Sequence, residues 1–195
     1  ELVDILASAV GSLTNPLKLA NTFKTVKKKT ISDKTLKKYM DYLMDAFLVS
    51  KAVRYDIKGR KYIGSPAKFY FEDVGLRNAR LNFRQMEENH IMENIIYNEL
   101  IIRGYSVDVG VVTSADHGKR IAREIDFIAT MGNEKIYIQS AYAMETDEKI
   151  AAETKPFSLA RDSFPKIIVR RDVHKSWRDE NGYLNIGIED FLLNY

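Results

Sequence analysis

The sequence predicts the α/β fold class, with an α+β arrangement over the whole chain. A mainly helical first part is followed by a second part of helices and strands. Three observations predict this class. An apolar stripe of helical period lies within residues 33–47, and two alternating segments follow it. A long helical pattern covers residues 89–103. Two strand-like runs, 123–129 and 135–141, come next and are separated by a glycine turn.

The first part of the chain reads as three helices. The first covers residues 2–10. Asn15 and Pro16 have the residue types of an N-cap and a first helical position, and Ser32 is a good N-cap for the third helix. The apolar stripe of the third helix comprises Leu36, Tyr39, Met40, Leu43, Met44 and Phe47.

A β-hairpin follows the third helix. Segments 49–57 and 60–63 alternate on either side of a Lys-Gly turn. Residues 68–71 read as a separate strand, and Asp73 reads as the N-cap of a short helix. Three helices followed by a hairpin indicate a winged helix-turn-helix.

Basic side chains of this module form a candidate nucleic-acid-binding surface. In a winged helix the third helix enters the major groove and the wing contacts phosphates. The helix offers no Arg, Asn or Gln for a bidentate base contact, and Asp41 and Asp45 lie on its polar face. A solvated face and a protein-docking role therefore stay open beside DNA binding. The candidate residues are Lys34, Lys37, Lys38, Arg54, Lys58, Arg60 and Lys61.

Charge differs between the two halves of the chain. Residues 1–90 hold 17 Lys and Arg against 10 Asp and Glu, whereas residues 91–195 hold 13 against 17. This asymmetry indicates two modules, with the basic one as the candidate for contact with DNA or another polyanion. We place the winged helix and its connector at residues 1–85 and the second domain at residues 86–195.

Composition narrows the function classes. The chain of 195 residues has no cysteine, so disulfides, thiolate metal sites and cysteine nucleophiles are excluded. No apolar run approaches the roughly 20 residues that a membrane-spanning helix needs. We expect a cytoplasmic protein without a membrane partner.

The elements of the second module follow from periodicity. After the helix over 89–103, a strand is expected at 107–112 and a charged surface loop at 114–123. A helix over about 146–159 and a strand over 166–170 follow the pair described above. The order is helix, three strands, helix, strand.

Two acidic residues of this module are candidate catalytic residues. Glu93 lies on the 89–103 helix, and Asp126 lies on the strand over 123–129. Helical Glu, strand Asp, hairpin and then acid-x-Lys is the layout of the PD-(D/E)XK phosphodiesterase superfamily, which the chain resembles until the last element. The resemblance implies a restriction-endonuclease-like αβββαβ core, with Gln139 at the second strand acid and Ala141 at the lysine.

The two replacements remove half of the site that the resemblance implies. Clustered carboxylates hold Mg²⁺, and the metal activates the attacking water. Gln offers one neutral carbonyl oxygen, and Ala offers no functional group. We expect Glu93, Asp126 and Gln139 to be vestigial catalytic positions without a metal. A migrated site that uses Glu124, Lys119 or Lys135 stays open as an alternative.

A more specific resemblance rests on five segments: "IMENIIYNELIIRGY", "REIDFIA", "IYIQSAY", "LMDAFLV" and "KFYFEDVGLRNA". Together they are similar to the uncharacterised C-terminal region of a family of prokaryotic AAA-type ATPases. That family implies a P-loop module before the winged helix, but no Gly-x-x-x-x-Gly-Lys-[Ser/Thr] motif occurs here. Because the chain begins at Glu1 without Met, we expect it to be part of a longer protein. The resemblance implies that ATP and Mg²⁺ bind to the missing P-loop module, and we expect no cofactor in this chain.

Three functional hypotheses remain. The first is a non-catalytic ATPase region, a winged helix plus a degenerate nuclease-like domain, that contacts a protein partner or nucleic acid. The second is a metal-dependent nuclease with a migrated active site. The third is a DNA-binding regulator in which the third helix and the wing dominate.

Overall fold

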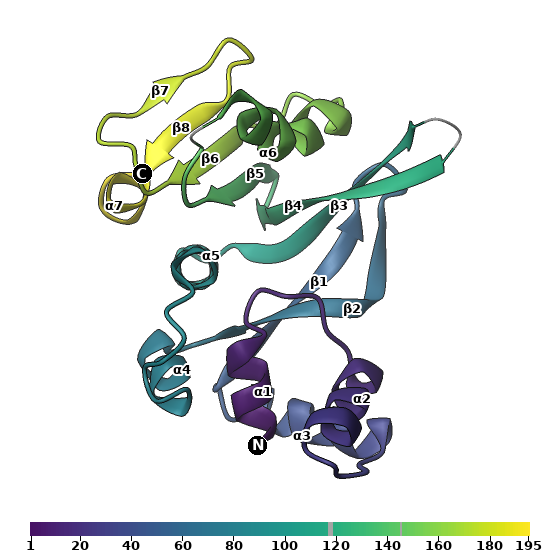
Figure 1. Ribbon diagram of the computed structural model, residues 1–195. Coiled ribbons are helices and arrows are strands. Elements are labelled where there is room, and N and C mark those ends of the chain that lie inside the picture. The colour runs from purple at the N-terminus through teal and green to yellow at the C-terminus, as the bar shows by residue number, and fades with distance from the viewer. Residues whose placement is uncertain (117–118, 145) are drawn as a thin grey trace. The chain divides into compact units, whose positions relative to one another are not determined.

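The computed structural model describes residues 1–116, 119–144 and 146–195 of the chain. These residues form a mixed α/β structure (Figure 1). The helices are α1 (Leu2–Ser8), α2 (Pro16–Val26), α3 (Asp33–Asp45), α4 (Val74–Arg80), α5 (Glu88–Ile102), α6 (Asp147–Ala160) and α7 (Ile188–Leu193). The strands are β1 (Val49–Asp56), β2 (Lys61–Phe71), β3 (Ser106–Asp116), β4 (Lys119–Met131), β5 (Glu134–Ala141), β6 (Lys166–Arg170), β7 (Trp177–Arg178) and β8 (Leu184–Gly187).

The chain forms two compact units that are not consecutive in sequence. Unit 1 comprises Glu1–Val53 and Gly64–Asn94, and unit 2 comprises Arg54–Ile63 and Ile95–Tyr195. The tip of the β1–β2 hairpin therefore belongs to unit 2, although its base belongs to unit 1. The division into a winged-helix domain at 1–85 and a second domain at 86–195 stays a prediction.

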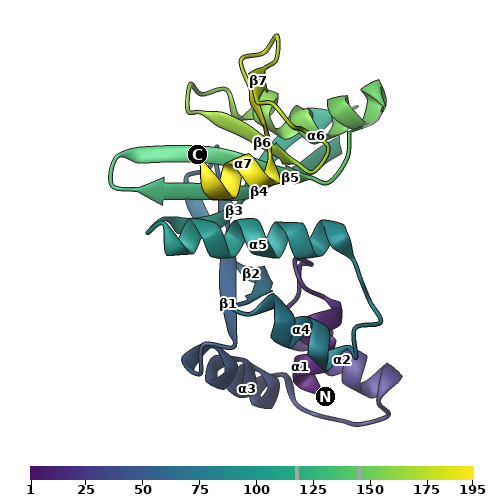
Figure 2. The ribbon, with the colours of Figure 1, turned by 90° about the vertical axis from the view of Figure 1, so that its left-hand side faces the viewer.

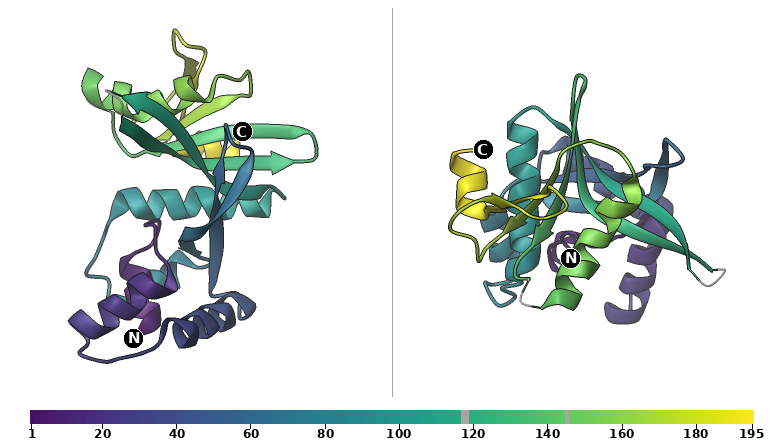
Figure 3. Two further views of the ribbon diagram at one scale, coloured as in Figure 1. Left: turned by 90° about the vertical axis from the view of Figure 1, so that its right-hand side faces the viewer. Right: turned by 90° about the horizontal axis from the view of Figure 1, so that it is seen from above.

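The strands form one mixed sheet with the order β2-β1-β3-β4-β5-β6-β8-β7. In unit 2, β3, β4 and β5 are antiparallel neighbours, and β5, β6 and β8 run parallel. The outer end of β1 runs parallel to β3. Helix α6 packs on β3, β4 and β5 (Figure 3), and α7 packs against β6 and β8 (Figure 2). The predicted order of helix, three strands, helix and strand is confirmed as an order of elements.

The core of unit 2 fixes the middle of β4 and β5. Ile125 and Ile128 of β4 and Tyr137 of β5 are buried with Phe157 of α6 in one apolar cluster. The sheet is closely packed at this point, because a Cβ added at Gly110 would lie 2.9 Å from the Cβ of Ile125. The polar residues between these apolar ones are therefore held in fixed positions.

The helices of unit 1 begin at the predicted caps. The side chains of Asn15, Ser32 and Asp73 accept backbone N–H groups of Lys18, Thr35 and Leu76. Helix α2 packs against α3, and the β2 residues Phe69–Phe71 are buried. Three helices and a hairpin follow one another in the expected order. The winged-helix assignment itself stays a prediction.

The predicted break between residues 63 and 68 is wrong. Strand β2 is continuous from Lys61 to Phe71. Thr14 pairs with the strand at Ala67 through two backbone hydrogen bonds of 2.8 and 3.0 Å. A tertiary partner thus keeps the backbone extended where Gly64, Ser65 and Pro66 favour a turn in the sequence.

The predicted charged loop over 114–123 is also wrong for most of its length. Strands β3 and β4 extend into it, with Thr113 opposite Ala122 and Ser114 opposite Ile121. Cross-strand hydrogen bonds therefore outweigh the loop-like composition of this segment. His117 and Gly118 lie outside the described residues.

The apolar stripe of α3 is only partly buried. Leu36 and Met40 are buried, whereas Tyr39 is 47% exposed and Phe47 is 81% exposed. Phe47 lies beyond the end of α3 and has a φ of 54°, so it does not continue the helical face. The stripe prediction is therefore wrong for Phe47, whereas Tyr39 lies on the helix but is not buried.

Candidate functional site

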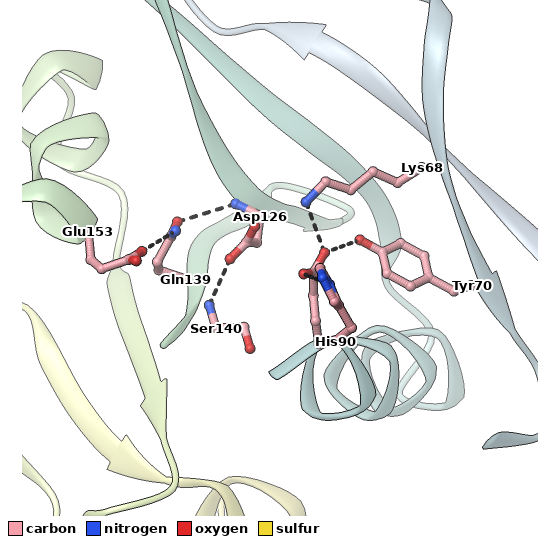
Figure 4. Close-up of polar contacts among 8 residues, drawn as sticks. Lys68, Tyr70, His90, Asp126, Gln139, Ser140 and Glu153 are labelled. Atoms are coloured by element: carbon pink, nitrogen blue, oxygen red, sulfur yellow. Dashed lines mark hydrogen bonds and ion pairs between the residues drawn. The ribbon is translucent and has the colours of Figure 1, made fainter. Parts of the chain in front are cut away.

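Two of the predicted site positions meet on neighbouring strands of unit 2. Asp126 of β4 and Gln139 of β5 are 9% and 8% exposed. The Asp126 N–H donates to the Gln139 side-chain oxygen at 3.3 Å, and the Ser140 N–H donates to the Asp126 carboxylate at 3.0 Å (Figure 4). Both side chains thus complete the backbone hydrogen bonding of this strand pair.

A third side chain, Glu153, joins this group from α6. The Gln139 amide nitrogen donates to the Glu153 carboxylate at 2.8 Å (Figure 4). Thr146 is the N-cap of α6, with its hydroxyl accepting the Lys149 N–H, and Phe157 packs the helix into the apolar cluster. One amide side chain therefore connects the β4 backbone to a helix carboxylate.

Sequence reasoning missed Glu153. A signal for it exists, because Glu153 lies four residues before Phe157 and residues at that spacing share a helix face. Once Phe157 is assigned to the core, Glu153 is expected on the sheet-facing side of the helix.

The surroundings of Glu153 raise the pKa of its carboxyl group. Burial raises its pKa above the ordinary value of 4.5, and the negative charge of Asp126 raises it further. The hydrogen bond from Gln139 and the charge of Lys149 act in the opposite direction, but the net shift is upward. The two carboxyl groups are therefore electrostatically coupled.

The position that the resemblance assigns to a lysine is apolar in its surroundings. Ala141 is buried in one cluster with Met144 and Phe157. A lysine ammonium at this place would be taken out of water into an apolar environment, which is costly. The residue that follows Gln139, Ser140, has a buried hydroxyl without a hydrogen-bond partner among the described residues.

Glu93 belongs to unit 1 and has partners of its own there. Its Oε1 atom lies 2.9 Å from the Lys68 ammonium and 2.6 Å from the Tyr70 hydroxyl (Figure 4). The neighbouring Asn94 exchanges two hydrogen bonds of 2.8 Å with the Phe71 backbone, which ties α5 to β2. Glu93 is thus a buried, ion-paired carboxylate.

Backbone packing also limits the space around Glu93. Gly11 has a φ of 70°, and a Cβ added there would lie 3.2 Å from the Glu93 carboxylate. His90 Nδ1 lies 4.0 Å from the Glu93 Oε2 atom. Sequence reasoning missed Lys68 and Tyr70, although a lysine beside a run of buried aromatic residues is itself a signal for a buried ion pair.

The structure therefore brings together only some of the predicted site residues within one unit. Unit 2 brings Asp126 and Gln139 together and adds Glu153, whereas Glu93 is described with its unit 1 partners. Among the described residues, no group of three or more His, Asp or Glu side chains is placed to hold a metal ion.

The residues that sequence analysis named for a migrated site also lie in unit 2. Glu124 is half-buried on β4, and Lys119 is exposed at the start of that strand. The Lys135 ammonium lies over two aromatic rings, 5.7 Å from the Tyr55 centroid and 5.1 Å from the Phe164 centroid.

The candidate nucleic-acid-binding residues fall into two groups. Lys34, Lys37 and Lys38 are exposed on α3 in unit 1. In unit 2, Lys58, Arg60 and Lys61 are exposed at the hairpin tip and Arg54 is half-buried.

Comparison with known proteins identifies relatives without a described activity. Residues 1–87 match a domain of unknown function, DUF8612. An uncharacterized protein of Haemophilus influenzae is 36% identical over 188 residues, which are 96% of this chain and 44% of that protein. The chain thus spans less than half of the length of this relative.

One solved structure is similar over most of the chain. The match to the crystal structure of protein VC1899 from Vibrio cholerae covers 98% of this chain and 52% of that protein's chain. The TM-score is 0.36 and the sequence identity is 13%. That score is too low to indicate a shared fold.

Among the described residues, each helix is too short or too polar to cross a membrane.

We predict that the Glu93–Lys68 ion pair stabilises unit 1. Glu93→Gln and Lys68→Met should each lower the free energy of unfolding by about 3–5 kcal/mol, because removing one partner of a buried ion pair is strongly destabilising. The double variant should lose less than the sum of the two single losses. Urea unfolding of the four proteins measures this coupling, and strictly additive losses would contradict it.

We predict a pH-dependent effect at Glu153. Because its pKa is raised in the folded state, the folded protein binds this proton more tightly than the unfolded chain. The contribution of Glu153 to stability therefore falls as pH rises from 4.5 through the raised pKa. Glu153→Gln removes this loss, so its stability relative to the wild type should increase with pH over that window. Urea unfolding between pH 4 and pH 8 tests this, with the exposed Glu148→Gln on the same helix as control. A stability difference for Glu153→Gln that does not change with pH would refute the assignment.

Proposed function

We propose that this chain is a non-catalytic region of an AAA-type ATPase, made of a winged helix and a nuclease-like domain that contacts a partner. The observation that supports loss of catalysis is the hydrogen bonding of Gln139. Its oxygen accepts the Asp126 N–H, and its nitrogen donates to Glu153. Both ends of the amide are therefore used within the protein.

The chemistry of phosphodiester hydrolysis explains why this arrangement is inactive. Mg²⁺ prefers anionic oxygen ligands in near-octahedral geometry. At Gln139 an N–H donor points to the neighbouring carboxylate, and the carbonyl oxygen is already an acceptor. The Asp126 carboxylate accepts a backbone N–H, and Ala141 supplies no cation.

The ATPase context is supported by sequence. The five segments quoted above span both halves of the chain, and the relative from Haemophilus influenzae is more than twice as long as the matched region. Further modules therefore have room in that relative. The order of three helices and a hairpin supports a winged helix. The exposed lysines of α3 and the hairpin support a contact role.

A metal-dependent nuclease with a migrated active site is the second candidate. Glu153 favours it, because this carboxylate is electrostatically coupled to Asp126 and shares Gln139 as a neighbour. In such an enzyme Glu153 would replace the strand acid, and the Gln139 oxygen would turn to the metal.

We predict no cleavage of single-stranded DNA, plasmid DNA or RNA by the wild type with Mg²⁺ or Mn²⁺. Loss of one charge-stabilising group alone lowers rates by about 10²–10³. Gel assays over hours test this, with Asp126→Ala as the matched control. Cleavage that both Asp126→Ala and Glu153→Ala abolish would reject the proposal in favour of a migrated site.

The same proposal makes a prediction for Gln139→Glu. A third carboxylate between Asp126 and Glu153 should increase Mn²⁺ affinity in calorimetric titrations, since it restores an anionic ligand. Gln139→Leu, which removes the amide without adding charge, should show no increase. An equal response of the two variants would contradict the proposed ancestry of this position.

A further inference from the structure

Two hollows of unit 2 adjoin at the tip of the β1–β2 hairpin. The first, of about 520 Å³, lies between the hairpin, β5 and the C-terminal end of α6. Lys58, Arg60, Lys135 and Arg161 supply cations to it, and Tyr55 and Phe164 supply aromatic rings. Sequence reasoning named Lys58 and Arg60 as nucleic-acid-binding candidates, and it named Lys135 only as a residue of a migrated nuclease site.

The first hollow has a net positive charge. Arg60 and Arg161 are exposed, and neither has an ion-pair partner among the described residues. Asp162 is the only acid of the lining, and the Lys166 ammonium lies 3.2 Å from it. The Tyr137 hydroxyl also donates to Asp162 at 2.7 Å, and burial raises the pKa of that tyrosine, which keeps it a neutral donor.

The second hollow extends the positive charge to the other side of the hairpin. It has a volume of about 600 Å³ and shares Lys58 with the first. Lys61 of β2 and Arg120 of β4 line it. Its acid, Asp56, accepts the Gly59 N–H at 2.9 Å within the hairpin turn. Residues 54–56 at the outer end of β1 pair with residues 109–111 of β3, so the hairpin tip lies beside the β3–β4 pair (Figure 3).

The aromatic wall of the first hollow is partly open to solvent. Phe164 is 39% exposed, and its ring stands edge-on to Tyr137 at a centroid distance of 6.1 Å. The Lys135 ammonium lies over the rings of Phe164 and Tyr55. A planar ligand group can therefore meet an aromatic surface and a fixed cation at the same place.

We propose that these hollows bind a single strand of nucleic acid. Phosphates lie along a basic track, and a base stacks on Phe164. Grooves with cations along the backbone path and aromatic side chains for the bases are typical of single-strand binding. A duplex keeps its bases stacked inside and cannot offer one to the ring. The basic track comprises Lys58, Arg60, Lys61, Arg120, Lys135 and Arg161.

This inference names the partner of the proposed contact role and rests on that role, but it does not depend on the loss of catalysis. Binding is therefore measured in EDTA, where metal-dependent cleavage is absent. Cleavage in the separate assay with metal would reject the non-catalytic function and leave the binding result intact.

The test is fluorescence anisotropy of a labelled 12-nucleotide oligo-dT titrated with the full chain at several salt concentrations. The slope of log affinity against log salt concentration measures the number of phosphate contacts. The double variant Arg60→Gln, Arg161→Gln should lower the magnitude of this slope by about 1.4, because each phosphate contact on a single strand contributes about 0.7. Phe164→Ala should weaken binding by about fivefold or more, the lower end of the effect of one stacking contact.

A matched control changes charge in unit 1. The double variant Lys24→Gln, Lys27→Gln removes two exposed cations at the C-terminal end of α2, the same number as the track variant, and should leave affinity and slope unchanged within twofold. Unfolding midpoints show whether each variant is folded. If Arg161→Gln disturbs the end of α6, Arg60→Gln with Lys61→Gln gives an independent reading of the track.

Four results would overturn the proposal. The track variants lose no more affinity than the Lys24→Gln, Lys27→Gln control. Phe164→Ala has no effect, which leaves non-specific electrostatics. Duplex DNA of the same length binds more tightly than the single strand. A 12-residue polyglutamate binds as tightly as oligo-dT, which identifies an acidic protein segment as the partner.

Discussion

The polar cluster of Asp126, Gln139 and Glu153 in unit 2 depends on one constraint. A buried side-chain amide needs hydrogen-bond partners for both its oxygen and its nitrogen. Gln139 meets this need with a backbone donor on β4 and a carboxylate acceptor on α6. An unsatisfied buried polar group costs about 1–3 kcal/mol, so this geometry resists rearrangement. The same side chain thus links two strands and a helix, at the position that the resemblance assigns to a metal ligand.

Unit 1 shows a second solution to the burial of an acid. Glu93 is neutralised by the Lys68 ammonium and also accepts the Tyr70 hydroxyl. In both units a carboxylate of the predicted site accepts donors supplied by the protein itself. Such hydrogen bonds stabilise the fold, and metal-ligating carboxylates make them as well. The proposed loss of catalysis therefore rests on Gln139, which offers no anionic oxygen to a metal.

Local patterns predicted the elements that depend on local interactions. Helix caps such as Asn15 and Ser32, helix α5 and strands β5 and β6 all follow from residue type and periodicity. Strand pairing also placed Asp126 beside Gln139. The partners from distant segments, Lys68 and Glu153, could not be predicted, because tertiary packing brings them to these acids. The lengths of β2, β3 and β4 likewise depend on neighbouring strands.

The most direct test of the central claim is a crystal structure of the chain soaked with Mn²⁺, with anomalous scattering used to find the metal. The account predicts no ordered Mn²⁺ at Asp126 or Glu153, with the Gln139 amide nitrogen still directed to Glu153. An anomalous peak coordinated by Asp126, Glu153 and the Gln139 oxygen would contradict it.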